Sequence, residues 1–111
     1  MAFTTASKDA AVNALTGLGT WVALCNGDPG TTGANTIAGV DRQQTTWGSS
    51  SSGTANGTQV TFSSVPAGSY THYAIFTAAT GGTFRWGFVL SPGVTLADVG
   101  TVLMTPRVTF P

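Results

Sequence analysis

The sequence predicts a mainly β protein: an antiparallel β-sandwich, of the jelly-roll or immunoglobulin-like kind, with one short α-helix at the N-terminus. Three observations carry this prediction. Short apolar or alternating segments recur after the first 20 residues. Glycine occurs 15 times in 111 residues, and together with Pro, Asn and Asp it separates these segments. A helical spacing of apolar residues is confined to the start of the chain. A chain of this length suits a single domain, 1–111.

Residues 4–18 are expected to form the helix. Asp9 is expected in its first turn, where a carboxylate interacts favourably with the positive end of the helix dipole. A helix this short must dock on the rest of the protein to be stable. The docking face is expected to contain Ala11, Leu15 and Leu18.

The strands are expected within residues 20–110. Their predicted ranges are 20–25, 42–47, 59–65, 71–77, 83–90, 94–96 and 101–110. Residues 48–57, which are mostly Gly and Ser, are expected to be a mobile loop, and Ser91-Pro92-Gly93 is expected to break the chain between two strands.

One predicted strand shows a clear alternation. In residues 83–88, strict alternation would place Phe84, Trp86 and Phe88 on one face of the sheet and Arg85 on the other.

Charge is scarce, and this excludes several functions. Only 7% of the residues are Asp, Glu, Lys or Arg, against about 25% in a typical domain, and the formal net charge is zero. Four basic residues cannot form the cluster that binding to nucleic acid or to an anionic membrane surface requires. No apolar stretch is long enough to span a membrane, and we expect no signal peptide, because Met1 is followed by no basic region and no apolar run. We therefore expect synthesis and assembly in a cytoplasm, as a subunit that does not need charge repulsion to stay soluble.

The sequence predicts no enzymatic activity, no cofactor and no metal site. General acid–base catalysis uses positioned His, Glu or Asp side chains, and this chain has one His and no Glu. A triad of Cys25, His72 and an Asp is conceivable, but no nucleophile motif surrounds Cys25, which is expected to be a small buried apolar residue. Zinc needs about four Cys or His ligands, and the spacing of Asp28, Asn35 and Asp41 does not match a calcium loop.

Aromatic side chains leave a recognition site open. Most of them are expected to fill the core, but a rigid aromatic ring can also stack on a sugar. The candidate glycan-facing residues are Trp47, Asn35 and Asp41, and Asp28 in the same loop is a further candidate for an interface or a ligand.

Four segments, in this order, resemble a family of small proteins labelled tail fibre or minor tail proteins of actinobacterial tailed phages. The segments are MAFTTASKDAAVNAL (1–15), WVALCNGDPGTTGAN (21–35), VDRQQTTWG (40–48) and VTFSSVPAGSYTHYAIFTAATGGTFRWG (60–87). The resemblance covers nearly the whole chain, and the loop from Asp28 to Asn35 is its most specific part. It implies a non-enzymatic structural protein of the virion.

The expected function is that of a homo-oligomeric tail-tip or tail-fibre-associated subunit, with a trimer as the expected state and other virion proteins as partners. Two alternatives stay open: a capsid decoration protein that clamps neighbouring capsid subunits, and a module that binds a host-surface glycan. Both chain ends, residues 1–5 and 105–111, are candidate interface segments, because a partner can order a terminus. The candidate interface residues in them are Met1, Phe3 and Phe110.

Overall fold

The protein is described by a computed structural model that covers residues 3–110, apart from the side chains of Ser91 and Pro92. These residues form one helix and eight strands, all paired antiparallel, which confirms the expected mainly β fold with an N-terminal helix. The elements are α1 (Thr5–Thr16), β1 (Trp21–Cys25), β2 (Gln43–Gln44), β3 (Thr54–Asn56), β4 (Val60–Val65), β5 (Gly68–Phe76), β6 (Phe84–Leu96), β7 (Gly100–Met104) and β8 (Arg107–Thr109).

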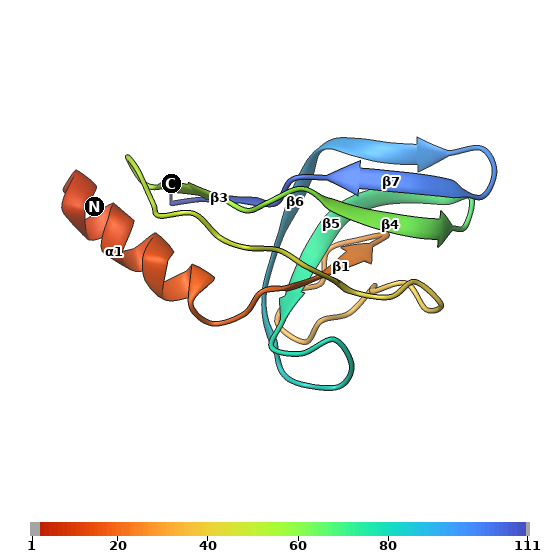
Figure 1. Ribbon diagram of the computed structural model, residues 1–111, viewed down its shortest axis with the longest axis horizontal. Coiled ribbons are helices and arrows are strands. Elements are labelled where there is room, and N and C mark those ends of the chain that lie inside the picture. Colours follow the sequence, from red (N-terminus) through yellow and green to blue (C-terminus); the bar gives the residue numbers. More distant parts are fainter. Residues whose placement is uncertain (1–2, 111) are drawn as a thin grey trace.

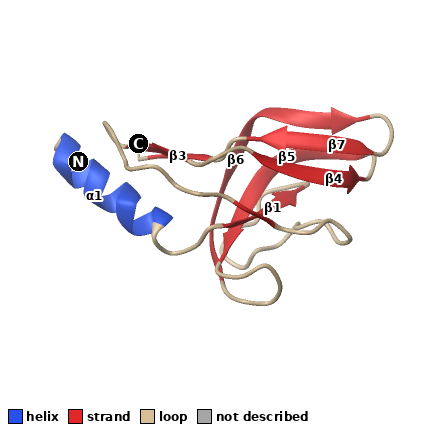
Figure 2. Cartoon of the chain, viewed as in Figure 1, coloured by secondary structure: helices blue, strands red, loops and turns tan. Residues whose placement is uncertain are grey.

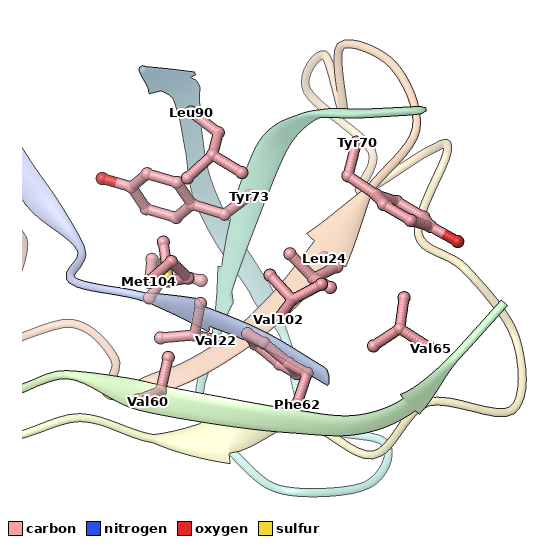
Figure 3. Packing of buried hydrophobic residues seen from close by; sticks show 11 residues of the cluster. Val22, Leu24, Val60, Phe62, Val65, Tyr70, Tyr73, Leu90, Val102 and Met104 are labelled. Carbon is pink, nitrogen blue, oxygen red and sulfur yellow. The ribbon is translucent and has the colours of Figure 1, made fainter. Parts of the chain in front are cut away.

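Two of the three sheets form a sandwich. The larger sheet has the strand order β2-β1-β5-β6, and the pair β4-β7 packs across its inner face. Strand β4 shows why: Val60, Phe62 and Val65 are buried while the residues between them are exposed, so one face of the strand is apolar. Figure 3 shows side chains of β4 and β7 meeting those of β1, β5 and β6 in the interior.

The outer face of the larger sheet is also covered. Strand β5 buries Tyr73 and Ile75 in the sandwich core and Ala74 and Phe76 in a second cluster on the opposite face. From Tyr73 to Phe76 its sequence is therefore a continuous apolar run and not an alternating one, as expected for a segment buried on both sides. Pro29, in the loop after β1, is fully buried and lies against Gly87 of this outer face.

The third sheet and the helix form a projection that we call the arm, comprising α1, β3 and β8. Figures 1 and 2 show the arm extending from one end of the sandwich, with both chain ends on it, and the molecule measures 45 × 27 × 23 Å. Val12 of α1 is buried against Ala55 of β3 and Val108 of β8. The arm thus has a small apolar core of its own, continuous with the sandwich through Trp47 and Trp86.

The helix differs from its prediction in two ways. It begins at Thr5, with Thr4 as the N-cap accepting a hydrogen bond from the Ser7 amide, so Asp9 lies in the second turn and not in the first. Its buried side chains are Val12 and Thr16, whereas Leu18 lies beyond the helix and is 44% exposed. The expected face was right for Leu15, which packs against the core of the arm, and wrong for Leu18, because the helix ends at Thr16, two residues earlier.

Residues 48–57 are not the open loop that their composition predicted, because they contain β3. The helix holds this segment through polar contacts: the Asp9 carboxylate accepts hydrogen bonds from Ser50 Oγ (2.8 Å) and the Gly53 amide (2.7 Å), and Asn13 Oδ1 accepts one from the Ser50 amide (2.9 Å). Strand β3 then pairs with β8. Distant side chains therefore supply the order that the local sequence lacks.

The Asp9 contacts predict that acid weakens the arm. The hydrogen bonds from Gly53 and Ser50 lower the pKa of Asp9 below its usual value of 3.8. A lowered folded-state pKa adds stability that is complete above the unfolded pKa and is lost as the pH falls through the folded one. We expect the protection of the Gly53 amide against hydrogen exchange, relative to an unfolded amide at the same pH, to fall below about pH 4, and Asp9→Asn to show low protection already at pH 7. Equal exchange in Asp9→Asn and the parent protein at pH 7 would contradict this.

Strand β6 differs most from the prediction. It is one strand from Phe84 to Leu96, but the expected break is present in its pairing: a register shift sets residues 90–93 opposite Thr71 alone, between the paired segments 84–89 and 94–96. A register shift pairs Ile75 with Trp86 but Phe76 with Phe84, which leaves Arg85 as an extra residue. This bulge turns Phe84 to the outer face, where its ring lies 5.6 Å from that of Phe76, while Trp86 packs on the inner side. The expected common face of Phe84 and Trp86 was therefore wrong.

Candidate assembly interface

A groove of about 560 Å³ lies where the sandwich meets the arm. Its apolar side comes from β5 and β6, and its polar side comes from the arm and from the link between β7 and β8. The lining residues are Tyr73, Phe88, Val89 and Leu90 on the first side and Asn56, Thr105, Arg107 and Thr109 on the second.

Strand β6 borders this groove with an unpaired edge. It is the outermost strand of its sheet and has no partner on its far side among the described residues. An edge strand presents free backbone N–H and C=O groups that can pair with another chain, and monomeric proteins usually protect such edges with charged residues, short strands or covering loops. Strand β6 is 13 residues long and carries a single charged residue, Arg85, but irregular pairing at Arg85 and at residues 90–93 interrupts its ladder. The regular stretch between them, residues 86–89, is the poorly protected part of the edge.

Val89 marks the exposed part of this edge. It pairs with His72 and faces outward, between the inward-packed Phe88 and Leu90, and it remains 52% exposed. Sequence reasoning did not select Val89 or Arg107. The signal was present in the run Phe88-Val89-Leu90, because alternate residues of a strand face opposite sides and one of the three must leave the core.

The floor of the groove is held in place by Tyr73. Its ring is buried, and its hydroxyl donates a hydrogen bond to the Arg107 carbonyl at 2.6 Å. Burial raises the pKa of Tyr73, so the hydroxyl keeps its proton and remains a donor. This bond ties β5 to the start of β8 and fixes the two sides of the groove relative to each other.

The two described terminal phenylalanines lie together on the arm. The rings of Phe3 and Phe110 are 5.0 Å apart in an edge-to-face arrangement, and Phe3 is 43% exposed. Met1, also expected at an interface, lies outside the described residues. The arm thus offers a second exposed apolar position.

The loop after β1 brings together two of the predicted site residues. Asp28 Oδ1 accepts a hydrogen bond from the Gly30 amide at 2.8 Å, and Asn35 Nδ2 donates one to the Asp28 carbonyl at 2.9 Å. Both residues are exposed, but these bonds shape the turn that places Pro29 on the sheet. Asp41 is exposed on a different segment, the one that leads into β2.

Arg42, which the sequence did not single out, fastens the β5–β6 hairpin. Its Nη1 donates hydrogen bonds to the carbonyls of Ala78 (2.9 Å) and Gly81 (2.8 Å), and its guanidinium lies 3.6 Å from the centre of the Phe76 ring. Burial lowers the pKa of Arg42 from its usual value. These contacts indicate that Arg42 has a structural role, which is to hold the β5–β6 hairpin in place.

Two members of the conceivable catalytic triad, Cys25 and His72, are neighbours in the sheet, but the thiol is not activated as a nucleophile. Cys25 and His72 face each other in the β1–β5 register. Burial, with a further contribution from the Asp28 charge, raises the pKa of the Cys25 thiol to about 12. A thiol needs to ionise to act as a nucleophile, and this one stays protonated at neutral pH. Cys25 instead packs with Ala23, Ala74 and Phe76 as an apolar residue.

In the part of the chain that the structure describes, we find neither a metal site nor a membrane-spanning helix. Residues 3–110 contain no grouping of three or more His, Cys, Asp or Glu side chains able to hold a metal ion. The described helix is too short, at 12 residues, to cross a bilayer.

A family model matches most of the chain. Residues 4–105, which include α1 and strands β1 to β7, match the family model described as Podophage GP4 fiber I protein gp80. No curated protein shows significant similarity to the chain. The match supports the phage-fibre part of the expected resemblance and gives no support to an actinobacterial host. The chain therefore belongs to the podophage GP4 fibre I protein gp80 family, and it is a phage fibre protein and a component of the virion.

Proposed function

We propose that this fibre protein is a non-enzymatic structural subunit that self-associates through the edge of β6 and the groove beside it. The proposal rests on one observation: β6 is a long, almost uncharged edge strand that lies next to a preformed groove. A strand added at this edge would satisfy the free backbone groups of β6 and cover Val89 at the same time.

The composition favours a second copy of this chain as the partner that binds at the β6 edge and its groove. With four basic and four acidic residues and no net charge, two copies do not repel each other. The β6 edge and the polar wall formed by β8 are different surfaces, so a contact between them is heterologous, and such contacts form a ring when the rotation between subunits closes. A trimer is the ring we propose.

The position in the particle is part of the same proposal. We place the oligomer at the tail tip or in a tail fibre, assembled in the host cytoplasm with other virion proteins as its neighbours. The alternative is a capsid decoration protein. Copy number separates the two: quantitative mass spectrometry of purified virions should find at most a few tens of copies per particle, and hundreds would favour the capsid.

The β6 interface is tested with a matched pair of substitutions. Val89→Lys places a charge where association would bury it without a partner, while Val99→Lys makes the same change in the β6–β7 turn, at a residue that is 62% exposed. An unpaired charge in an interface costs about 2 kcal/mol or more, so Val89→Lys should weaken association about 30-fold or more. Sedimentation equilibrium should find three chain masses of 11.2 kDa for the parent protein and for Val99→Lys.

Salt provides an independent check. The contacts at this edge are apolar groups and backbone hydrogen bonds, so raising the salt from about 0.1 to 1 M should leave the oligomer intact. A parent protein that sediments as a monomer, or an oligomer that Val89→Lys leaves unchanged, would refute the interface.

A further inference from the structure

We infer that a second groove, between the C-terminal part of α1 and the segment from Gln44 to Ser49, binds an uncharged saccharide. It has a volume of about 400 Å³, within the range of about 300–1,000 Å³ of small-molecule sites. It lies on different elements from the β6 edge, so this inference does not rest on the proposed self-association. The side chains that can contact a ligand are those of Asn13, Gln44, Thr46, Trp47 and Ser49.

Trp47 supplies a fixed aromatic surface. Its indole Nε1 donates a hydrogen bond to the Gly19 carbonyl at 3.0 Å, and its ring lies 5.8 Å from that of Trp86. Trp47 is nevertheless only partly buried, so part of the ring borders the groove. A ring held in this way can pack against the apolar face of a sugar without losing further conformational freedom on binding.

The amides beside Trp47 are oriented and have hydrogen-bonding capacity left. Asn13 uses its side-chain oxygen to accept from the Ser50 amide at 2.9 Å, a bond that does not involve its NH₂ group. Gln44 uses its NH₂ group to donate to Thr20 Oγ1 at 3.2 Å, a bond that does not involve its side-chain oxygen. One donor and one acceptor are thus directed by existing bonds, and sugar hydroxyls can pair with both.

The absence of charge selects the class of ligand. Every residue lining this groove is uncharged at neutral pH. Phosphate, sulfate and carboxylate groups are usually recognised by Arg or Lys, which are not present here. Hydroxyl-rich neutral sugars need only the amides, hydroxyls and aromatic surface that this groove has. Trp47 was the one predicted glycan-facing residue in this groove. Asn35 and Asp41 do not line it.

Binding is tested with the full chain on an array of neutral oligosaccharides built from glucose, galactose, mannose and N-acetylhexosamines. Sialylated and uronic-acid-containing oligosaccharides form the charged comparison set. We expect the protein to bind at least one neutral oligosaccharide, and we expect no binding that depends on a charged sugar. Gln44→Ala removes one hydrogen bond and should weaken that binding about three- to tenfold. Thr46→Lys should abolish it by filling the groove. Both residues are exposed, so the fold should persist.

Two controls make the result specific. Gln59→Ala removes an exposed amide outside the groove and should leave binding unchanged. A trimer gains avidity on an array, so Val89→Lys is compared with the parent by calorimetry against the soluble oligosaccharide, where the affinity per chain should be equal. A failed β6 interface and a failed sugar site therefore remain distinguishable. The inference is overturned if no neutral oligosaccharide binds, if only charged ones bind, or if Thr46→Lys binds as well as the parent.

Discussion

Phe62→Ala should lower the free energy of unfolding by about 3–5 kcal/mol, the largest effect we expect for a single side chain. Phe62 is fully buried at the centre of the sandwich, where β4 meets the larger sheet (Figure 3). Its removal loses the transfer free energy of the ring and leaves a cavity between two sheets that cannot close without shifting their register. A domain of this size has a stability of about 5–15 kcal/mol, so the variant should be marginal at 37 °C.

Phe3→Ala is the matched control, because it removes the same side chain from an exposed position. Its ring contacts Phe110 edge-on, and such a pair is worth about 0.5–1.5 kcal/mol. Urea denaturation followed by circular dichroism gives both values. A loss below about 1.5 kcal/mol for Phe62→Ala would show that the two sheets are not joined as described.

The same experiment tests domain organisation. We propose that residues 1–111 form a single domain, because Trp47 and Trp86 belong to the apolar clusters of both the sandwich and the arm. Tryptophan fluorescence at this junction and circular dichroism of the strands should then give coincident transitions. Two separate transitions would mean that the arm unfolds on its own.

The strands of the sandwich were predictable because each carries its information locally. Strands β1, β4 and β5 fall within or next to their expected ranges, since burial on one face or both leaves an apolar pattern in the sequence. Strand β3 has no such pattern. Its only buried side chain is Ala55, and it depends on Asp9 and Asn13, about 40 residues earlier. No local rule can detect that partnership.

The candidate sites were predictable only in part, because only features visible in the local sequence could be selected. The chain ends and Trp47 were selected as aromatic or terminal features, and the structure places them on the arm and in a groove. The continuity of β6 was missed because Ser91-Pro92-Gly93 suggests a break, and its pairing with β5 is interrupted at residues 90–93. A proline lacks the N–H that a central strand needs, but an edge strand or a bulge tolerates it. The feature that hid the strand is therefore consistent with its place at the sheet edge.

Gly87→Ala should lower the free energy of unfolding by about 1–3 kcal/mol and expose Cys25 to thiol reagents. A Cβ at position 87 would overlap Pro29 Cγ and lie 3.1 Å from the Tyr73 carbonyl oxygen, so the loop carrying Pro29 must lift from the sheet. Cys25 lies in the cluster on this outer face and is fully buried, with a pKa of about 12. Lifting the loop should hydrate the thiol and lower that pKa, because burial is its main cause.

Reaction with a disulfide reagent at pH 8 measures this opening, and Gly17→Ala is the control. A Cβ at position 17 would have its nearest neighbours at 3.4 and 3.5 Å, an ordinary contact distance, in a backbone conformation that alanine adopts readily. The control should react as slowly as the parent, whereas Gly87→Ala should react at least about tenfold faster, since only thiolate attacks the reagent. If Gly87→Ala keeps both the parent stability and an unreactive thiol, the turn shaped by Asp28 and Asn35 does not serve to seat Pro29 on the sheet, and those two exposed side chains would need another explanation, such as contact with a partner.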